Sequence, residues 1–227
     1  MPYTKEVWKG GALLAPVPPT MVTCRSGAVA NVLTIAWTGI LNTIPPKTYI
    51  SVRPERYSYN LIKESGVFVI NLTTEDLVRA CDFCGVKSGE NTDKFKEMNL
   101  EVTQGSKVDV PLLADSPINI ECKVTEIVNL GSHHMFIANI VAINVAKELL
   151  DKNGRLQMEK AGLVAYAHGE YFALGDKLGS FGYSVKKKTK KRKGKAFSEK
   201  RVSFSDERLA KSRAKGKGKA SSKSSKS

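Results

Sequence analysis

Hydrophobic and β-branched residues gather in short runs along the first 184 residues of the chain. Such runs, bounded by Gly, Pro, Asn or Ser, are typical of β-strands. The segment KTYISVR also alternates polar and apolar positions, which is the period of a strand with one buried face. The LGSHH segment between the last two runs is a hairpin signal. We therefore expect strands over residues 28–37, 47–53, 67–72, 119–130 and 135–145.

Two segments have helical spacing instead. After Pro54, which suits the first turn of a helix, Leu61 and Ile62 follow Tyr57 by four and five residues, and Gly66 ends the segment. Residues 75–84 predict a second helix whose apolar stripe is Leu77, Val78, Cys81 and Cys84. Strands outnumber helices and most connections are short, so the pattern predicts a mainly β fold with a few helices, either a barrel or a sandwich.

The charge of the chain is concentrated at its C-terminal end. The net charge is +14, but residues 185–227 contain 18 Lys and Arg against 3 Asp and Glu, while residues 1–184 contain 18 against 19. The high basicity therefore indicates nothing about what residues 1–184 bind. Residues 185–227 are rich in Lys, Ser and Gly and poor in aliphatic residues, so we expect a disordered tail after a domain formed by residues 1–184.

The four cysteines, Cys24, Cys81, Cys84 and Cys122, have no metal-ligand spacing, and we expect no metal site. The CDFC segment at 81–84 permits a redox dithiol, but it closes the expected helix rather than opening one, so buried inert thiols are the simpler interpretation. The N-terminus has no signal-peptide pattern and no apolar run reaches the length of a membrane span. We expect a cytoplasmic protein.

The segment SVRPERYSYN, residues 51–60, places two arginines where a strand turns into a helix. A helix N-terminus has free N–H groups and partial positive charge, so with Arg53 and Arg56 it suits an anion. Ser51 or Ser58 would add a hydroxyl group. The alternative is that both arginines form surface ion pairs with Glu55 or Glu64, and on this stretch alone that interpretation is preferred because surface ion pairs are common.

The segment from Ala30 to Leu72, followed in order by DFCGVKSGENTDKF, LGSHHMF and HGEYFALGDKLGSFGYS, resembles the flavin reductase-like family, and within it the flavoredoxin-type branch. The resemblance covers about residues 14–184. It implies a Greek-key split β-barrel of the FMN-binding kind, and a homodimer with FMN near the subunit interface. It also implies NAD(P)H as electron donor.

The resemblance also implies which residues contact FMN. Arg53, Arg56, Ser58 and Lys94 match the phosphate end, where a dianion needs cations and hydroxyl donors. Asn31, Thr34, Ala36 and Trp37 match the segment along the ribityl chain and ring. Ser51, Cys84, Ser88 and Tyr166 match further positions near the cofactor.

Two adjacent histidines follow the hairpin turn, and neighbouring strand residues point to opposite faces, so they are unsuited to binding one metal together. The family often has Gly-Asp-His here, and this chain has Gly131, Ser132 and His133. His133 therefore matches the histidine near the flavin and nicotinamide pocket, without the carboxylate. We expect His134 to be an exposed hairpin residue.

Three functions follow from these observations. The first is an FMN-dependent NAD(P)H oxidoreductase whose acceptor is a flavin, a ferric complex or a redox protein. The second is an electron carrier of the same fold with little direct NAD(P)H turnover. The third, of another class, is a polyanion- or nucleic-acid-binding protein that acts through its basic tail, with salt-dependent binding to phosphates.

Overall fold

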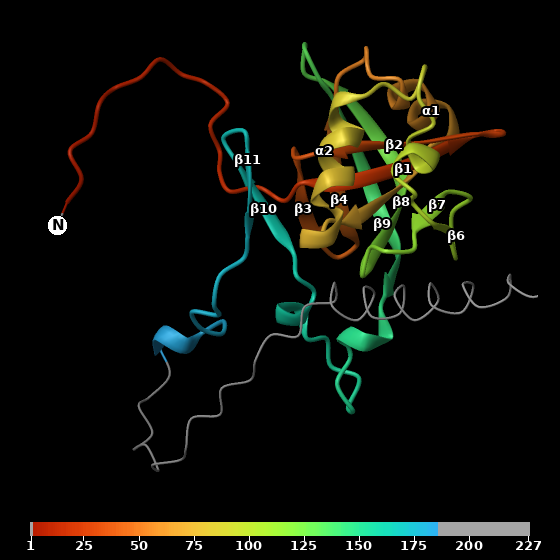
Figure 1. Cartoon of the computed structure of the whole chain (residues 1–227). Helices are drawn as coiled ribbons and strands as arrows, with labels where there is room; N and C mark the ends of the chain where they lie inside the picture. The colour runs from red at the N-terminus through yellow and green to blue at the C-terminus, as the bar shows by residue number, and fades with distance from the viewer. Residues whose placement is uncertain (1, 186–227) are drawn as a thin grey trace, which may run out of the picture. The chain divides into compact units, whose positions relative to one another are not determined.

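The computed structural model describes residues 2–185, in which β-strands predominate (Figure 1). The strands are β1 Thr20–Ser26, β2 Val29–Ile35, β3 Thr38–Thr43, β4 Pro46–Val52, β5 Val67–Leu72, β6 Val102–Gln104, β7 Pro111–Leu113, β8 Ile118–Asn129, β9 His134–Val145, β10 Val164–Ala167 and β11 Glu170–Ala173. The helices are α1 Ser58–Ser65, α2 Val78–Val86 and α3 Lys94–Glu97. The 3-10 turns are η1 Glu75–Leu77, η2 Lys147–Leu149, η3 Met158–Lys160 and η4 Tyr183–Val185. The predicted class, mainly β with a few helices, is confirmed.

Seven strands form one antiparallel sheet in the order β2-β1-β5-β8-β9-β4-β3. β2 and β4 are far apart in this order, yet Leu33 of β2 and Ile50 of β4 belong to the same buried cluster. Phe68 of β5 and Phe136 of β9, both fully buried, complete the centre of that cluster. The sheet therefore curls around one core, as the strands of a barrel do, and the crossover from β4 to β5 runs through α1.

The corner between β4 and α1 differs from the prediction. The N–H of Arg56 donates to the carbonyl of Arg53 at 3.0 Å, so Pro54 lies in a tight turn and the helix begins only at Ser58. Proline suits the second position of such a turn because its ring presets φ. The predicted end is confirmed, since Gly66 has a φ of 68° and its N–H donates to the carbonyl of Ile62.

The second predicted helix is longer at its C-terminal end. A 3-10 turn leads into α2, which continues past the predicted end at Cys84 through Gly85 and Val86. The N–H of Lys87 still donates to the carbonyl of Phe83 at 2.9 Å. Figure 1 shows α2 beside β1 and β2, whose buried Met21 and Val32 pack against it.

Of the described residues, 2–177 form one compact unit and 178–185 belong to a second. The predicted tail at 185–227 lies outside the described residues, except for Val185, and the predicted boundary after residue 184 stays a prediction. Within residues 2–185, no helix has both the length and the apolarity that crossing a membrane requires.

Candidate functional site

Two adjoining pockets lie where β2, β4, α1 and α2 meet. The aromatic pocket has a volume of about 360 Å³ and is lined by Pro19, Leu33, Thr34, Ile35, Ala36, Trp37, Ser51, Val52, Arg53, Arg56, Asp82, Gly85, Val86, His133, Tyr166 and Tyr171. The polar pocket has a volume of about 110 Å³ and is lined by Asn31, Leu33, Thr34, Glu55, Arg56, Tyr57, Ser58, Cys84, Gly85, Val86, Lys87, Ser88, Gly89 and Lys94. Every residue that the sequence analysis named for the site lines one of them, although the role of each toward a cofactor stays a prediction.

The polar pocket is organised by a buried pair from β2 and α1. The side-chain Nδ2 of Asn31 donates a 2.7 Å hydrogen bond to the hydroxyl of Ser58, the first residue of α1. The chain after α2 passes very close to this pair, because a Cβ placed on Gly89 would lie 2.2 Å from Oδ1 of Asn31. Only glycine fits at this position unless Asn31 moves, which explains the sequence Ser-Gly there.

Two cations bind the carbonyl groups at the C-terminal end of α2. The ammonium of Lys94 is buried and donates to the carbonyls of Val32, at 2.8 Å, and Cys84, at 2.9 Å. Arg56 donates to the carbonyl of Gly85 at 3.2 Å. Burial lowers the pKa of Lys94, and the nearby Arg56 lowers it further. These contacts offset the negative end of the α2 dipole, so the polar pocket keeps a favourable potential for an anion.

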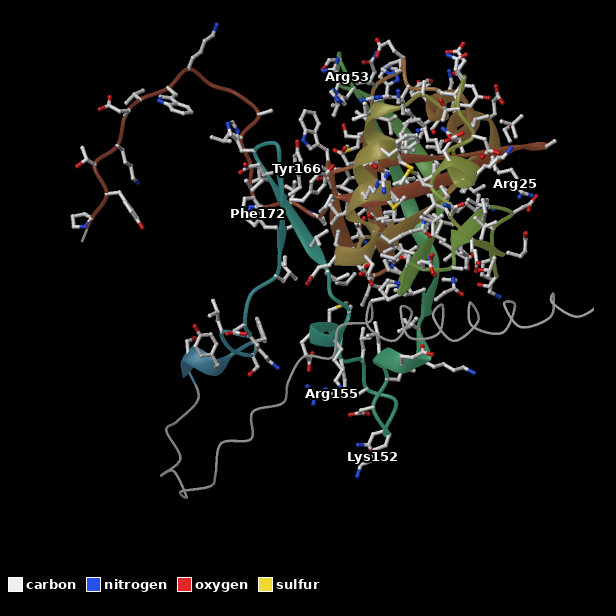
Figure 2. The ribbon with its side chains drawn as sticks, in the orientation of Figure 1. Arg25, Arg53, Lys152, Arg155, Tyr166 and Phe172 are labelled. Atoms are coloured by element: carbon white, nitrogen blue, oxygen red, sulfur yellow. The ribbon has the colours of Figure 1, made fainter. Side chains whose placement is uncertain are left out.

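The free side of the polar pocket has the chemistry of a phosphate site. It joins the N-terminus of α1 and the Ser58 hydroxyl with Arg56, Lys87 and Lys94, against one carboxylate, Glu55. Within residues 2–185 the only ion pair joins Arg25 to Asp109, at 3.5 Å. The alternative that Arg53 and Arg56 pair with nearby glutamates is therefore wrong. Figure 2 shows Arg53 and Arg25 in separate parts of the unit.

One side of the aromatic pocket is formed by Trp37 and His133, whose ring centroids are 4.6 Å apart. Desolvation lowers the pKa of His133, and the positive charge of Arg53 acts in the same direction. Its Nδ1 lies 3.0 Å from the hydroxyl of Ser132. Ser132 thus contacts the histidine at the position where the resemblance implies an aspartate, and it gives the ring a hydroxyl partner rather than a carboxylate.

A second aromatic pair, Tyr166 and Tyr171, comes from the β10–β11 hairpin. The ring centroids are 5.3 Å apart in an edge-on arrangement, and the Tyr171 hydroxyl donates to Asp82 of α2 at 3.3 Å. Tyr171, Asp82 and Gly89 also line the pockets and were not predicted from the sequence. Residues 164–173 place aromatic residues and Ala on both sides of a His-Gly turn, and this pattern could have predicted a hairpin with one buried face.

His134 is not the exposed residue that we expected. Its side chain is half-buried, and its Nδ1 lies 2.7 Å from the hydroxyl of Tyr59 in α1. The rings of these two residues meet edge-on, with centroids 5.3 Å apart. The two histidines do diverge, one to the aromatic pocket and one to α1, as strand alternation requires.

The four cysteines are free and buried, as the simpler interpretation expects. Burial raises the pKa of Cys24 and Cys84 to about 11 and that of Cys122 to about 12, and it also raises the pKa of Cys81. Thiols of this kind carry little thiolate at neutral pH and react slowly. Among the described residues no group of three or more His, Cys, Asp or Glu is placed to hold a metal ion.

Comparisons with known proteins agree with this arrangement. The model of the flavin reductase like domain family matches residues 13–175. Flavoredoxin of Desulfovibrio vulgaris (Miyazaki F) is 31% identical, with a TM-score of 0.75 over 81% of this chain and 100% of that chain. Flavoredoxin from Methanosarcina acetivorans, at 24% identity and a TM-score of 0.73 over 81% and 100%, supports the fold alone. The NADPH-flavin oxidoreductase of Streptomyces viridifaciens is 25% identical over 70% of this chain and 84% of its own length.

Proposed function

Since the chain belongs to the flavin reductase-like family, we propose that it binds FMN across the two pockets and transfers electrons from NAD(P)H to an acceptor. The observation that carries the proposal is the junction of the pockets: a small basic pocket opens beside a larger one in which the rings of Trp37 and His133 form one side. A phosphate needs the first and a planar ring needs the second.

The residues fit FMN in a definite order. Arg56, Ser58 and Lys94 would hold the phosphate, with Arg53 at the side of the aromatic pocket. Asn31 and Thr34 lie along β2, between the two ends; Asn31 is oriented by Ser58, and the hydroxyl of Thr34 donates to the carbonyl of Cys81.

Trp37 and His133 would lie on the ring side, where they exclude water and bind a nicotinamide ring. When bound, FMN would supply the redox chemistry by accepting a hydride from the nicotinamide. A neutral His133, which its lowered pKa favours, suits that pocket because it adds no charge beside Arg53.

We also propose that two copies of the chain assemble around the site. Trp37 and Val86 line the aromatic pocket and are 47% and 71% exposed in one subunit. The β3–β4 hairpin exposes Ile40 and Ile44, at 66% and 90%. Exposed apolar side chains of this kind are typical of an interface. Sedimentation velocity of the purified protein tests this, and a monomer at all concentrations would reject it.

The similarity to flavoredoxin favours a second candidate, an electron carrier with bound FMN and little direct turnover of NAD(P)H. The first experiment separates the two: an absorption spectrum before and after anaerobic addition of NADH or NADPH. Flavin bands that bleach rapidly support the reductase, and free flavin or a ferric chelate is then added as acceptor. Bands that bleach only with dithionite or a redox protein support the carrier. A protein that takes up no FMN rejects both.

A further inference from the structure

Tyr171 lines the aromatic pocket but has no role in the proposed cofactor contacts. Besides the hydrogen bond to Asp82 and the edge-on contact with Tyr166, its side chain packs against a buried cluster that includes Leu77 and Cys81. One side chain thus joins β11 to η1 and α2, and it touches the Tyr166 ring of β10.

The β10–β11 hairpin, which carries these tyrosines, makes few backbone contacts with other segments. β10 and β11 have four residues each and form a two-stranded sheet. Backbone hydrogen bonds of 2.9 and 2.8 Å join Tyr166 to Val17, one of 3.3 Å joins Val164 to Thr73, and a bridge joins Leu163 to Thr74 just before β10. Among the described strands, β11 pairs only with β10. A two-stranded hairpin is marginally stable by itself, so the position of β11 depends on its pairing with β10 and on side-chain contacts.

The two faces of the hairpin differ. Tyr166 and Tyr171 are directly paired across the strands and share the face that lines the pocket. Phe172, one residue later, points to the other face and is 48% exposed. Figure 2 labels Tyr166 on β10 and Phe172 on β11.

We propose that Tyr171 is a positioning residue. Through its hydrogen bond to Asp82, it holds the Tyr166 ring in the aromatic pocket. A second planar ring, from the electron donor or the acceptor, binds there beside the cofactor. The proposal rests on the proposed function, since it needs FMN in the same pocket. Trp37 and His133 then lie on the ring side of FMN, and Tyr166, held by Tyr171, lies beside the second ring.

The test uses the full chain loaded with FMN and titrated with p-hydroxybenzaldehyde, a planar ring without phosphate, with binding followed by the flavin absorption. Tyr171→Phe and Asp82→Ala should each weaken probe binding by about three- to tenfold, the size of one aromatic contact, without changing the affinity for FMN. The double variant should be no weaker than either single variant, since both remove the same hydrogen bond. Phe172→Tyr, on the outer face of the same strand, is the control and should bind the probe normally.

A second readout needs no cofactor. In the FMN-free protein, amide hydrogen exchange over residues 164–173 should be faster in Tyr171→Phe and Asp82→Ala, with β5 and β8 unchanged. Unchanged probe binding and exchange, or additive effects in the double variant, would overturn the proposal. Parallel loss of FMN affinity would also overturn it, by placing Tyr171 in the cofactor site. A wild-type protein that takes up no FMN rejects the proposed function itself, and this inference with it.

Discussion

The side chain of Asn31 is held between Ser58, to which it donates a 2.7 Å hydrogen bond, and the chain at Gly89. The contact connects three separate segments: β2, the start of α1 and the loop after α2. The orientation of the Asn31 side chain therefore depends on all three segments. A substitution in any of them can alter the polar pocket without changing its charge.

Gly89→Ala should weaken FMN binding, because the new Cβ would meet Oδ1 of Asn31 at 2.2 Å and force the pair apart. Losing one hydrogen bond of this kind corresponds to about a five- to tenfold change in affinity. Flavin fluorescence quenching measures the affinity. Gly10→Ala, where a Cβ would meet nothing within 4 Å, is the matched control. Equal affinity in both variants would show that the loop does not approach bound cofactor.

Arg53→Ala should weaken FMN binding by about 2 kcal/mol, the contribution of a charge-assisted hydrogen bond. The same titration measures it, and the loss should shrink at high salt because part of the attraction is long-range. Arg25→Ala is the control, since Arg25 contacts Asp109 outside both pockets. An Arg53 variant that binds FMN as tightly as the control would remove Arg53 from the site.

Glu121 should make the free energy of unfolding depend on pH in the acidic range. It is fully buried; burial alone would raise the pKa of this carboxyl, but hydrogen bonds from Ser106, Asn144 and the N–H of Lys107 lower it from 4.5 to about 2. A carboxyl with a lowered pKa in the folded state stabilises above its unfolded pKa, and that stability is lost as pH falls from about 4.5 to about 2.

Urea unfolding of wild type and Glu121→Gln across this pH range measures the effect. The wild type should lose on the order of 3 kcal/mol more than the variant between pH 5 and pH 2, by linkage. The variant should be less stable than wild type at neutral pH, because its amide replaces one carboxylate oxygen with a donor facing other donors. Parallel pH profiles would mean that other carboxyls cause the acid unfolding.

Deletion of residues 185–227 should leave FMN binding intact and abolish binding to polyanions, since the basic residues in excess lie there. Flavin absorption and heparin-column retention measure the two properties on the same preparations. Retention of the shortened chain at the same salt concentration would place polyanion binding on residues 1–184. Loss of the flavin would show that the tail contributes to the site.

Several strands could be predicted from the sequence, because a buried strand has a local run or alternation of apolar residues. The run at residues 67–72 is nearly uniform in apolar side chains, and the run at residues 119–130 begins with alternating polar and apolar side chains; β5 and β8 match these runs within one residue. β1 and β3 were missed, because TMVTCRS and TGILNT mix polar and apolar residues without a clear period. β1 is nevertheless mostly buried, and β3 is mostly exposed. Gly27, in the turn before β2, was a signal for the β1–β2 hairpin.

The sequence by itself determined the strand-rich class, the end of α1 at Gly66, the divergence of the two histidines and, through its resemblance to a family, many of the residues that line the two pockets. Local spacing and chain stereochemistry suffice for the first three. Only the tertiary structure decided that Lys94 is buried against the end of α2, that His134 bonds Tyr59, and that Tyr171 joins Asp82, 89 residues away. These contacts depend on which segments the folded sheet brings together. The residues involved are far apart along the chain, so the local sequence pattern does not predict that they meet.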